Sequence, residues 1–172
     1  MDDASGVATS LVTVEPSTGR ITSMAQNRTY NNTQEHGERE TAVNYNTDFL
    51  YGGGSGFPPG STFKPFTLAE WLKEGGHSLS EQVDARRFSY RFREFSAPCT
   101  ALNGGTEYKF NNAEGPRSGG VMSVLDATRN SVNSGYIAMA SQLNLCGIMD
   151  TATALGIHRA GGQSGGRPVR PA

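Results

Sequence analysis

The sequence predicts an α+β fold, because its beginning carries the pattern of strands and its later part the pattern of helices. Between residues 8 and 26, apolar and polar side chains alternate on either side of a turn, which is the period of a β-strand. From residue 61 onward, apolar side chains recur at helical spacing in several short segments. The length of 172 residues is that of one domain with a real core.

The strand pattern predicts a β-hairpin. The alternation runs from Leu11 to Val14, the chain turns at residues 16–19, and the apolar pattern resumes at Ile21. A hairpin alone is only marginally stable, so this one needs more sheet or a helix to lie on. Residues 27–56 are polar and rich in Asn, Thr and Gly, and we expect loops there.

Four helices are expected after the hairpin. The first runs from about Ser61 to Glu74 and is ended by two glycines. Three shorter helices follow within VMSVLDATRNS, SGYIAMASQLN and IMDTATALG, with Gly147 and Gly156 as breaks. We assign residues 1–160 to the folded part, and residues 161–172, rich in Gly, Pro and Arg, to a flexible tail or truncated loop.

The charge balance gives no support for a nucleic-acid partner. The chain has 15 basic and 16 acidic residues and a net charge of -1, so it lacks the positive field that attracts nucleic acid or an anionic membrane. One segment, ARRFSYRFREF at residues 85–95, interleaves arginines with aromatic rings, as single-strand binders do. With a neutral chain, a half-buried strand or loop with solvated arginines is the favoured interpretation.

Ser61 and Lys64 form the first candidate for chemistry. Residues three apart on a helix share a face, and a lysine whose pKa is lowered by burial can remove the proton of a serine hydroxyl. Backbone N–H groups at the helix start could also stabilise an oxyanion. The pattern S-x-x-K is short, however, and taken alone it favours an N-cap serine followed by a solvated lysine.

Ser131 and Asn133 form the second candidate. They lie in RNSVNSGY, at the junction of two predicted helices. A second serine could relay protons to a leaving group, and an amide could hold a peptide carbonyl or orient the lysine. The alternative is a turn and a helix cap, in which Ser and Asn are common.

Together these motifs resemble those of the penicillin-binding proteins and serine β-lactamases. The segments VTVEPSTGRITSMAQNRTYN, AVNYNTDFLYGGGSGFPPGSTFKPFTLAEWL and ATRNSVNSGYIAMASQLNLCGIMDTATALGIH are similar to the transpeptidase domain of class A penicillin-binding proteins, especially actinobacterial ones. The resemblance implies helices packed on one antiparallel sheet. It also implies that Ser61 attacks D-Ala-D-Ala stem peptides, with Lys64 as base, Ser131 as proton relay and Asn133 as substrate contact.

The resemblance also implies partners and a location. The partners are peptidoglycan stem peptides and β-lactam antibiotics, with no metal or organic cofactor, and the site is at the extracytoplasmic face of the bacterial membrane. Cys99 and Cys146 are by spacing compatible with a disulfide or with two buried thiols; an extracytoplasmic location favours the disulfide. A serine β-lactamase-like hydrolase and a non-catalytic β-lactam sensor or wall-binding module are the alternative functions.

One motif of the family has no counterpart in this sequence. The family's third motif, Lys-Thr-Gly, lies on a strand after S-x-N, whereas the only similar triplet here, at 117–119, precedes Ser131. Without further strands, the hairpin would leave unpaired backbone groups and an exposed apolar face. We therefore expect an incomplete domain that lacks its C-terminal sheet strands, complemented by another chain or segment.

Overall fold

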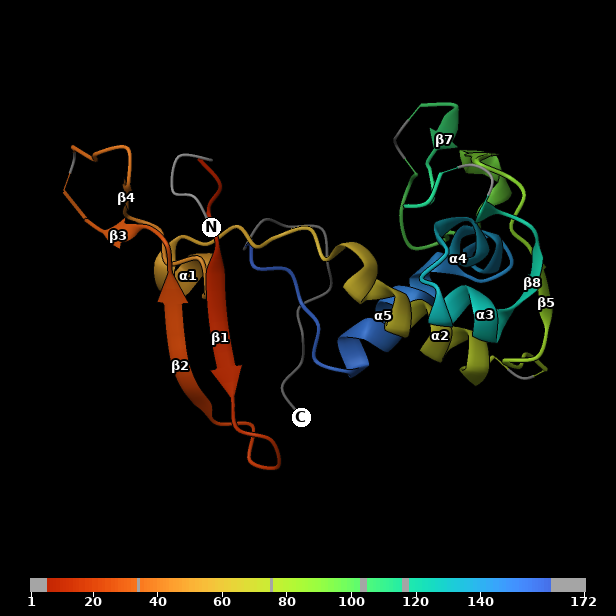
Figure 1. The fold of residues 1–172 in the computed structure, drawn as a ribbon, viewed down its shortest axis with the longest axis horizontal. Helices are drawn as coiled ribbons and strands as arrows, with labels where there is room; N and C mark the ends of the chain where they lie inside the picture. Colours follow the sequence, from red (N-terminus) through yellow and green to blue (C-terminus); the bar gives the residue numbers. More distant parts are fainter. Residues whose placement is uncertain (1–5, 34, 75, 103–104, 116–117, 162–172) are drawn as a thin grey trace. The chain divides into compact units, whose positions relative to one another are not determined.

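The computed structural model describes residues 6–161 except 34, 75, 103–104 and 116–117. The chain divides into two compact units, residues 1–58 with 158–172, and residues 59–157. Both units contain helices and strands (Figure 1). The expected combination of helices and strands is therefore present, and it is distributed over two units. Most of the expected tail, 162–172, lies outside the described residues, as does Arg117.

The first unit is built around the predicted hairpin, which the structure confirms. Strand β1 (Ser10–Val14) pairs antiparallel with β2 (Ile21–Gln26), side by side in Figure 1. All residues of β1, and all but the last of β2, are exposed. Two short strands, β3 (Thr29–Tyr30) and β4 (Glu40–Thr41), pair in parallel, and one helical turn, α1 (Phe49–Gly52), follows.

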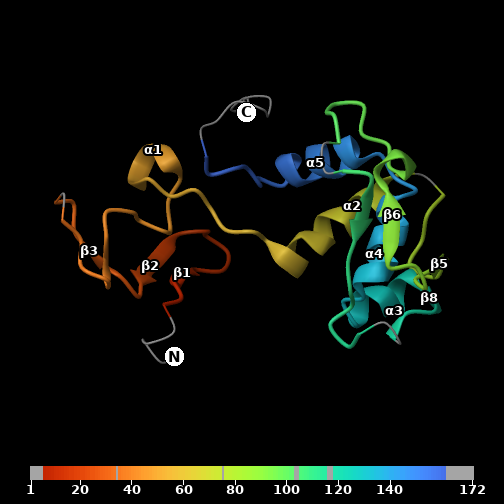
Figure 2. The same cartoon turned by 90° about the horizontal axis from the view of Figure 1, so that it is seen from above.

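The second unit contains the hydrophobic core. Its helices are α2 (Lys64–Lys73), α3 (Val124–Arg129), α4 (Asn133–Ala140) and α5 (Leu145–Ala154), gathered together in Figure 2. Helix α2 packs on α4 and α5, and α3 packs on α4. The largest members of the core cluster are Trp71, Tyr136, Met139, Leu143 and Ile148. The predicted helical segments are thus confirmed.

Short strands border these helices. Strand β5 (Gln82–Asp84) pairs antiparallel with β8 (Val121–Ser123), and β6 (Ser89–Arg91) pairs antiparallel with β7 (Glu107–Lys109). A short 3₁₀ turn, η3 (Phe92–Glu94), follows β6. Within the described part of the chain, strands pair only two by two, and the single larger sheet implied by the resemblance stays a prediction.

The expectation that Gly147 breaks a helix is wrong, because Gly147 lies inside α5. The reason is a close approach between helices. A Cβ atom at residue 147 would stand 2.3 Å from Oε1 of Glu70 in α2, so the glycine makes room for a buried carboxylate. Gly156 does follow the end of α5, with φ +91°, as a glycine that stops a helix should.

The helix around Ser61 begins differently from the expected one. Residues Gly60–Phe63 form a 3₁₀ turn, η2, and the α-helix starts only at Lys64. The backbone N–H of Lys64 donates to the carbonyl of Ser61, which is the i to i+3 bond of a 3₁₀ helix. Pro65, in the first turn of α2, has no N–H to leave unpaired. None of the helices in the described ranges is long and apolar enough to cross a membrane.

Candidate active site

Ser61 and Lys64 lie on the same side of the η2 turn. In a 3₁₀ helix, residues three apart stand one above the other, so the bond from Lys64 N to Ser61 O places the two side chains in line. Ser61 is exposed and Lys64 is half-buried. Among the described residues, no hydrogen bond joins Ser61 Oγ to Lys64 Nζ, and the proposed pairing of the two groups stays a prediction.

The Lys64 amine is bound by the second motif instead. It donates to the carbonyl oxygen of Ser131 (2.5 Å), to Ser131 Oγ (2.9 Å) and to Asn133 Oδ1 (2.7 Å). These residues are 67 and 69 positions away in sequence. These contacts are as many as the three donors of an ammonium group could serve. The structure therefore brings together three of the four residues singled out in the sequence.

Ser131 is held in an unusual backbone conformation. Its φ is +51°, in the left-handed region that non-glycine residues rarely adopt. The N–H of Ser131 donates to Thr128 O, and the N–H of Val132 donates to Ala127 O. This is the Schellman pattern that closes a helix, and its left-handed position usually holds glycine. A serine kept there is a strained residue of the kind that clusters at functional sites.

A buried tyrosine beneath the lysine was missed by the sequence analysis. Lys64 Nζ stands 5.3 Å from the centre of the Tyr136 ring, within the range of a cation–π interaction. The ring is buried, and the Tyr136 hydroxyl shares a hydrogen bond of 2.9 Å with Thr128 Oγ1. Tyr136 follows Asn133 by three residues in α4, so the helical spacing was the signal that could have found it.

Burial lowers the pKa of Lys64 below the usual lysine value. The cause is desolvation, which disfavours the charged amine. A lowered pKa increases the fraction of neutral amine near neutral pH, and only the neutral amine can accept a proton. The lowered pKa therefore suits Lys64 to act as a general base, and the exposed Ser61 is three residues away in sequence.

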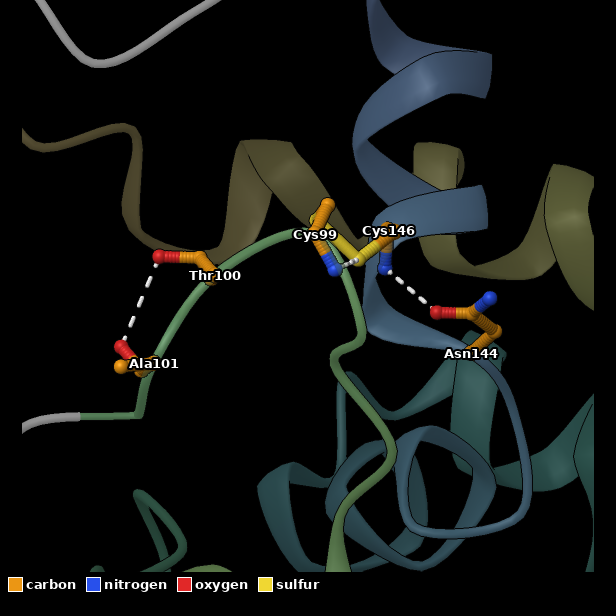
Figure 3. Close-up of a disulfide and its surroundings, with 5 residues drawn as sticks. All are labelled: Cys99, Thr100, Ala101, Asn144 and Cys146. Atoms are coloured by element: carbon orange, nitrogen blue, oxygen red, sulfur yellow. Dashed lines mark hydrogen bonds between the residues drawn. A yellow bond between two sulfur atoms is a disulfide. The ribbon is translucent and has the colours of Figure 1, made fainter.

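A disulfide bond joins Cys99 to Cys146, 47 residues apart (Figure 3). Cys146 lies at the start of α5, where its N–H donates to the Oδ1 of the helix-capping residue Asn144 at 2.9 Å. Closing a loop of this length contributes about 4 kcal/mol in the chain-entropy account. The bond ties the segment after β6 to the helix that packs against α2.

The arginines and aromatic rings of residues 85–95 are engaged in ion pairs and ring contacts within the protein. Arg86 pairs with Asp84, and Arg87 pairs with Glu94 while its guanidinium lies 3.8 Å from the centre of the Tyr90 ring. The aromatic rings of the segment also pack against one another or against those of β7 and its neighbour. In the described part of the chain, no group of three or more His, Cys, Asp or Glu side chains could hold a metal ion.

Comparison with known proteins gives one family. The model of the penicillin-binding protein transpeptidase domain matches residues 9–166. No curated protein and no solved structure shows a significant match to the chain. The match places the chain among acyltransferase-type enzymes. More narrowly, the chain belongs to the penicillin-binding protein transpeptidase family, for which stem peptides are substrates and β-lactams are ligands.

Proposed function

We propose that this protein is a peptidoglycan D,D-transpeptidase that forms an acyl-enzyme on Ser61. The observation that carries the proposal is the binding of the Lys64 amine by Ser131 and Asn133, at 2.5 to 2.9 Å. A lysine with a lowered pKa, a second hydroxyl on the same amine and an exposed serine one turn away supply the groups that acyl transfer needs. The family match supports the same chemistry.

The proposed reaction has two steps. Ser61 Oγ attacks the carbonyl carbon of the penultimate D-alanine, and neutral Lys64 takes the hydroxyl proton. Ser131 Oγ passes a proton from the amine to the nitrogen of the departing D-alanine, so the C–N bond breaks as the ester forms. An amine of a neighbouring stem peptide then attacks the ester carbonyl carbon and forms the new amide bond. Its proton passes through Lys64 and Ser131 to Ser61 Oγ as the C–O bond breaks, which regenerates Ser61. Asn133 binds the substrate and keeps the Lys64 amine in position.

Before the first step, Lys64 must exchange a partner. Its amine is within hydrogen-bond distance of Ser131 and Asn133, whereas among the described residues no hydrogen bond joins it to Ser61 Oγ. Loss of one proton to solvent frees a lone pair, which can then turn toward the Ser61 hydroxyl. A β-lactam would follow the same first step: its ring C–N bond opens, the nitrogen takes the proton, and the leaving group stays attached.

The finer classification is also part of this proposal. The resemblance of the quoted segments supports a class A, actinobacterial type of transpeptidase. The disulfide between Cys99 and Cys146 supports an extracytoplasmic location, because disulfides persist in oxidising compartments.

We further propose that the hairpin of the first unit receives additional strands from a complementing part of the same domain. Its apolar side chains are exposed, with Leu11 at 61% and Ile21 at 54%, and an exposed apolar hairpin is a template for further pairing.

Mass spectrometry after incubation with penicillin tests the central claim. We expect one covalent adduct on the wild-type protein and none on Ser61→Ala. Ser55→Ala, an exposed serine in the preceding loop, should keep the adduct. Absence of an adduct on the wild type, or its persistence on Ser61→Ala, would remove Ser61 as the nucleophile.

Two further measurements separate the alternative functions. A synthetic peptide ending in D-Ala-D-Ala should release D-alanine; stable acylation without this release would favour a β-lactam sensor. The penicillin adduct should persist for many turnover times of the peptide reaction, and rapid loss of the adduct as hydrolysed penicillin would favour a β-lactamase.

A further inference from the structure

Two consecutive asparagines outside the recognised motifs hold the S-x-N segment in place. Asn112 is 5% exposed and Ser134 is 0% exposed. The Asn112 amide makes two hydrogen bonds to this one residue: its Nδ2 donates to Ser134 Oγ (2.9 Å), and its Oδ1 accepts from the Ser134 N–H (2.9 Å). The two residues are 22 positions apart in sequence, so the contact fixes a loop against a helix.

The contact replaces a missing helix cap. Helix α4 begins at Asn133, and the residue before it, Val132, has no side-chain hydrogen bond to the first turn. Val132 instead packs in the core with Ala85 and Ala127. The first N–H groups of a helix need acceptors from elsewhere, and Asn112 supplies one to the N–H of Ser134. The start of α4 is thus capped from a distant segment.

The neighbouring residue, Asn111, determines how the Asn133 amide points. Asn133 Nδ2 donates to the carbonyl of Asn111 (2.7 Å), and Asn133 Oδ1 accepts from Lys64 Nζ (2.7 Å). The opposite orientation would set two acceptors together on one side and two donors together on the other. The Asn111 carbonyl therefore directs the amide oxygen toward the lysine.

We propose that Asn112 is a positioning residue for the Lys64 amine. Docking of its side chain onto Ser134 sets the adjacent Asn111 carbonyl, this carbonyl orients Asn133, and Asn133 holds Lys64. Asn112 touches no reacting atom in this arrangement. The consequence for acylation rests on the proposed function, whereas the consequence for the lysine does not.

Competitive acetylation measures how much of the Lys64 amine is neutral and accessible, and it does not require the protein to be catalytically active. A trace of acetic anhydride acetylates neutral, accessible amines with loss of acetate, and peptide mass spectrometry compares Lys64 with the exposed Lys109 as internal reference. In Asn112→Ala we expect Lys64 labelling relative to Lys109 to rise several-fold over wild type. Asn130→Ala removes an exposed amide whose Nδ2 donates to Asp126 O in α3, and should leave the ratio unchanged.

A second variant covers the possibility that Asn112→Ala does not fold. Ser134→Ala removes only the hydroxyl that accepts from Asn112 and keeps the backbone N–H, so it should give a smaller rise of the same ratio. Folding of each variant is checked first by circular dichroism. Unchanged Lys64 labelling in every folded variant of Asn112 and Ser134 would overturn the proposal, whether or not the protein acylates.

Acylation kinetics then connect the residue to function. If Asn112 acts through Asn133, penicillin acylation in the double variant of Asn112→Ala and Asn133→Ala should be no slower than in Asn133→Ala alone, because coupled residues are not additive. Effects that multiply would show that Asn112 acts independently of Asn133, and would contradict this chain of contacts. A wild type that fails to acylate would contradict the proposed function and leave the labelling result to decide the positioning.

Discussion

The hairpin of the first unit and the helices of the second unit are stabilised in very different ways. Every buried hydrophobic residue in the described chain lies in the second unit, where Trp71 and Val124 are 0% exposed. The hairpin buries none of its strand residues. All four candidate site residues also belong to the second unit. The chemistry is therefore placed on the part that has a core of its own, which is where side chains can be held precisely.

The largest expected effect comes from truncating the core. Trp71→Ala should lower the free energy of unfolding of the second unit by about 3 to 5 kcal/mol, because a fully buried aromatic leaves a cavity. Its indole N–H also donates to Ser78 O, and this acceptor would lose its partner. Urea denaturation followed by circular dichroism measures the change.

Leu11→Ala in the hairpin is the matched control. Its side chain is already exposed to solvent, so the change should stay within about 0.5 kcal/mol. A large loss of stability in Leu11→Ala would mean that the hairpin is packed in solution, and the contrast between the two units would disappear.

Two glycines, one in each unit, test the difference in packing with a smaller expected change in stability. Gly147→Ala places a methyl group against the buried Glu70 carboxylate at 2.3 Å, and overpacking of this kind costs about 1 to 3 kcal/mol. In the first unit, Gly37→Ala meets Glu40 only at ordinary contact distance, 3.5 Å, and should be nearly neutral. Equal melting temperatures for the two variants would contradict the close approach of α2 and α5.

Two serines with positive φ separate strain from function. Ser17, in the hairpin turn, has φ +76°, and Ser131 has φ +51°. Ser17→Gly should raise stability by about 1 kcal/mol, because glycine relieves the left-handed cost. Ser131→Gly should gain less, because it also removes the hydroxyl that accepts from Lys64 Nζ. Ser131→Gly should also slow penicillin acylation about a hundredfold, the scale of a lost proton-transfer group. Ser17→Gly should acylate normally; slow acylation there would link the hairpin to the site.

The smallest expected effect on stability is the pH dependence caused by Lys64. Burial lowers the pKa of Lys64 in the folded state, so between that pKa and the ordinary lysine value the unfolded chain binds more protons. Stability should therefore rise with pH through this window. The rate of acylation should rise in the same direction and level off below pH 10.5, the ordinary lysine value, because the neutral amine is the base.

Lys73 is the control for this titration. It lies on the same helix, but a hydrogen bond to Glu70 raises its pKa. Lys73→Gln should leave the midpoint of the acylation profile unmoved. A midpoint that shifts in Lys73→Gln would assign the titration to another group.

Regular patterns could be predicted from the sequence. The hairpin and the helices α3, α4 and α5 follow from alternation and helical spacing, which are local properties. The division into two units could not be predicted, because it depends on which elements bury their faces together. Gly147 shows the limit most clearly: its flexibility suggested a break, whereas its small size was what mattered, since Glu70 packs against it.

The site was predictable in its motif residues and not in its supporting ones. Ser61, Lys64, Ser131 and Asn133 were found through short motifs and a long resemblance. Asn111 and Asn112 were not found. They lie in an irregular segment without a repeating pattern of side chains, and their hydrogen-bond partners are 22 residues away in sequence. The 3₁₀ start of the first helix was also missed, since helix ends depend on the bonds of individual residues.

The bond between Cys99 and Cys146 has a kinetic consequence for folding. Asn112 and Ser134 both lie inside the loop that it closes. With the ends of this loop tied, the unfolded chain keeps the two residues at a higher effective concentration than an open chain would. Oxidation before folding would therefore shorten the search by which the loop finds its helix.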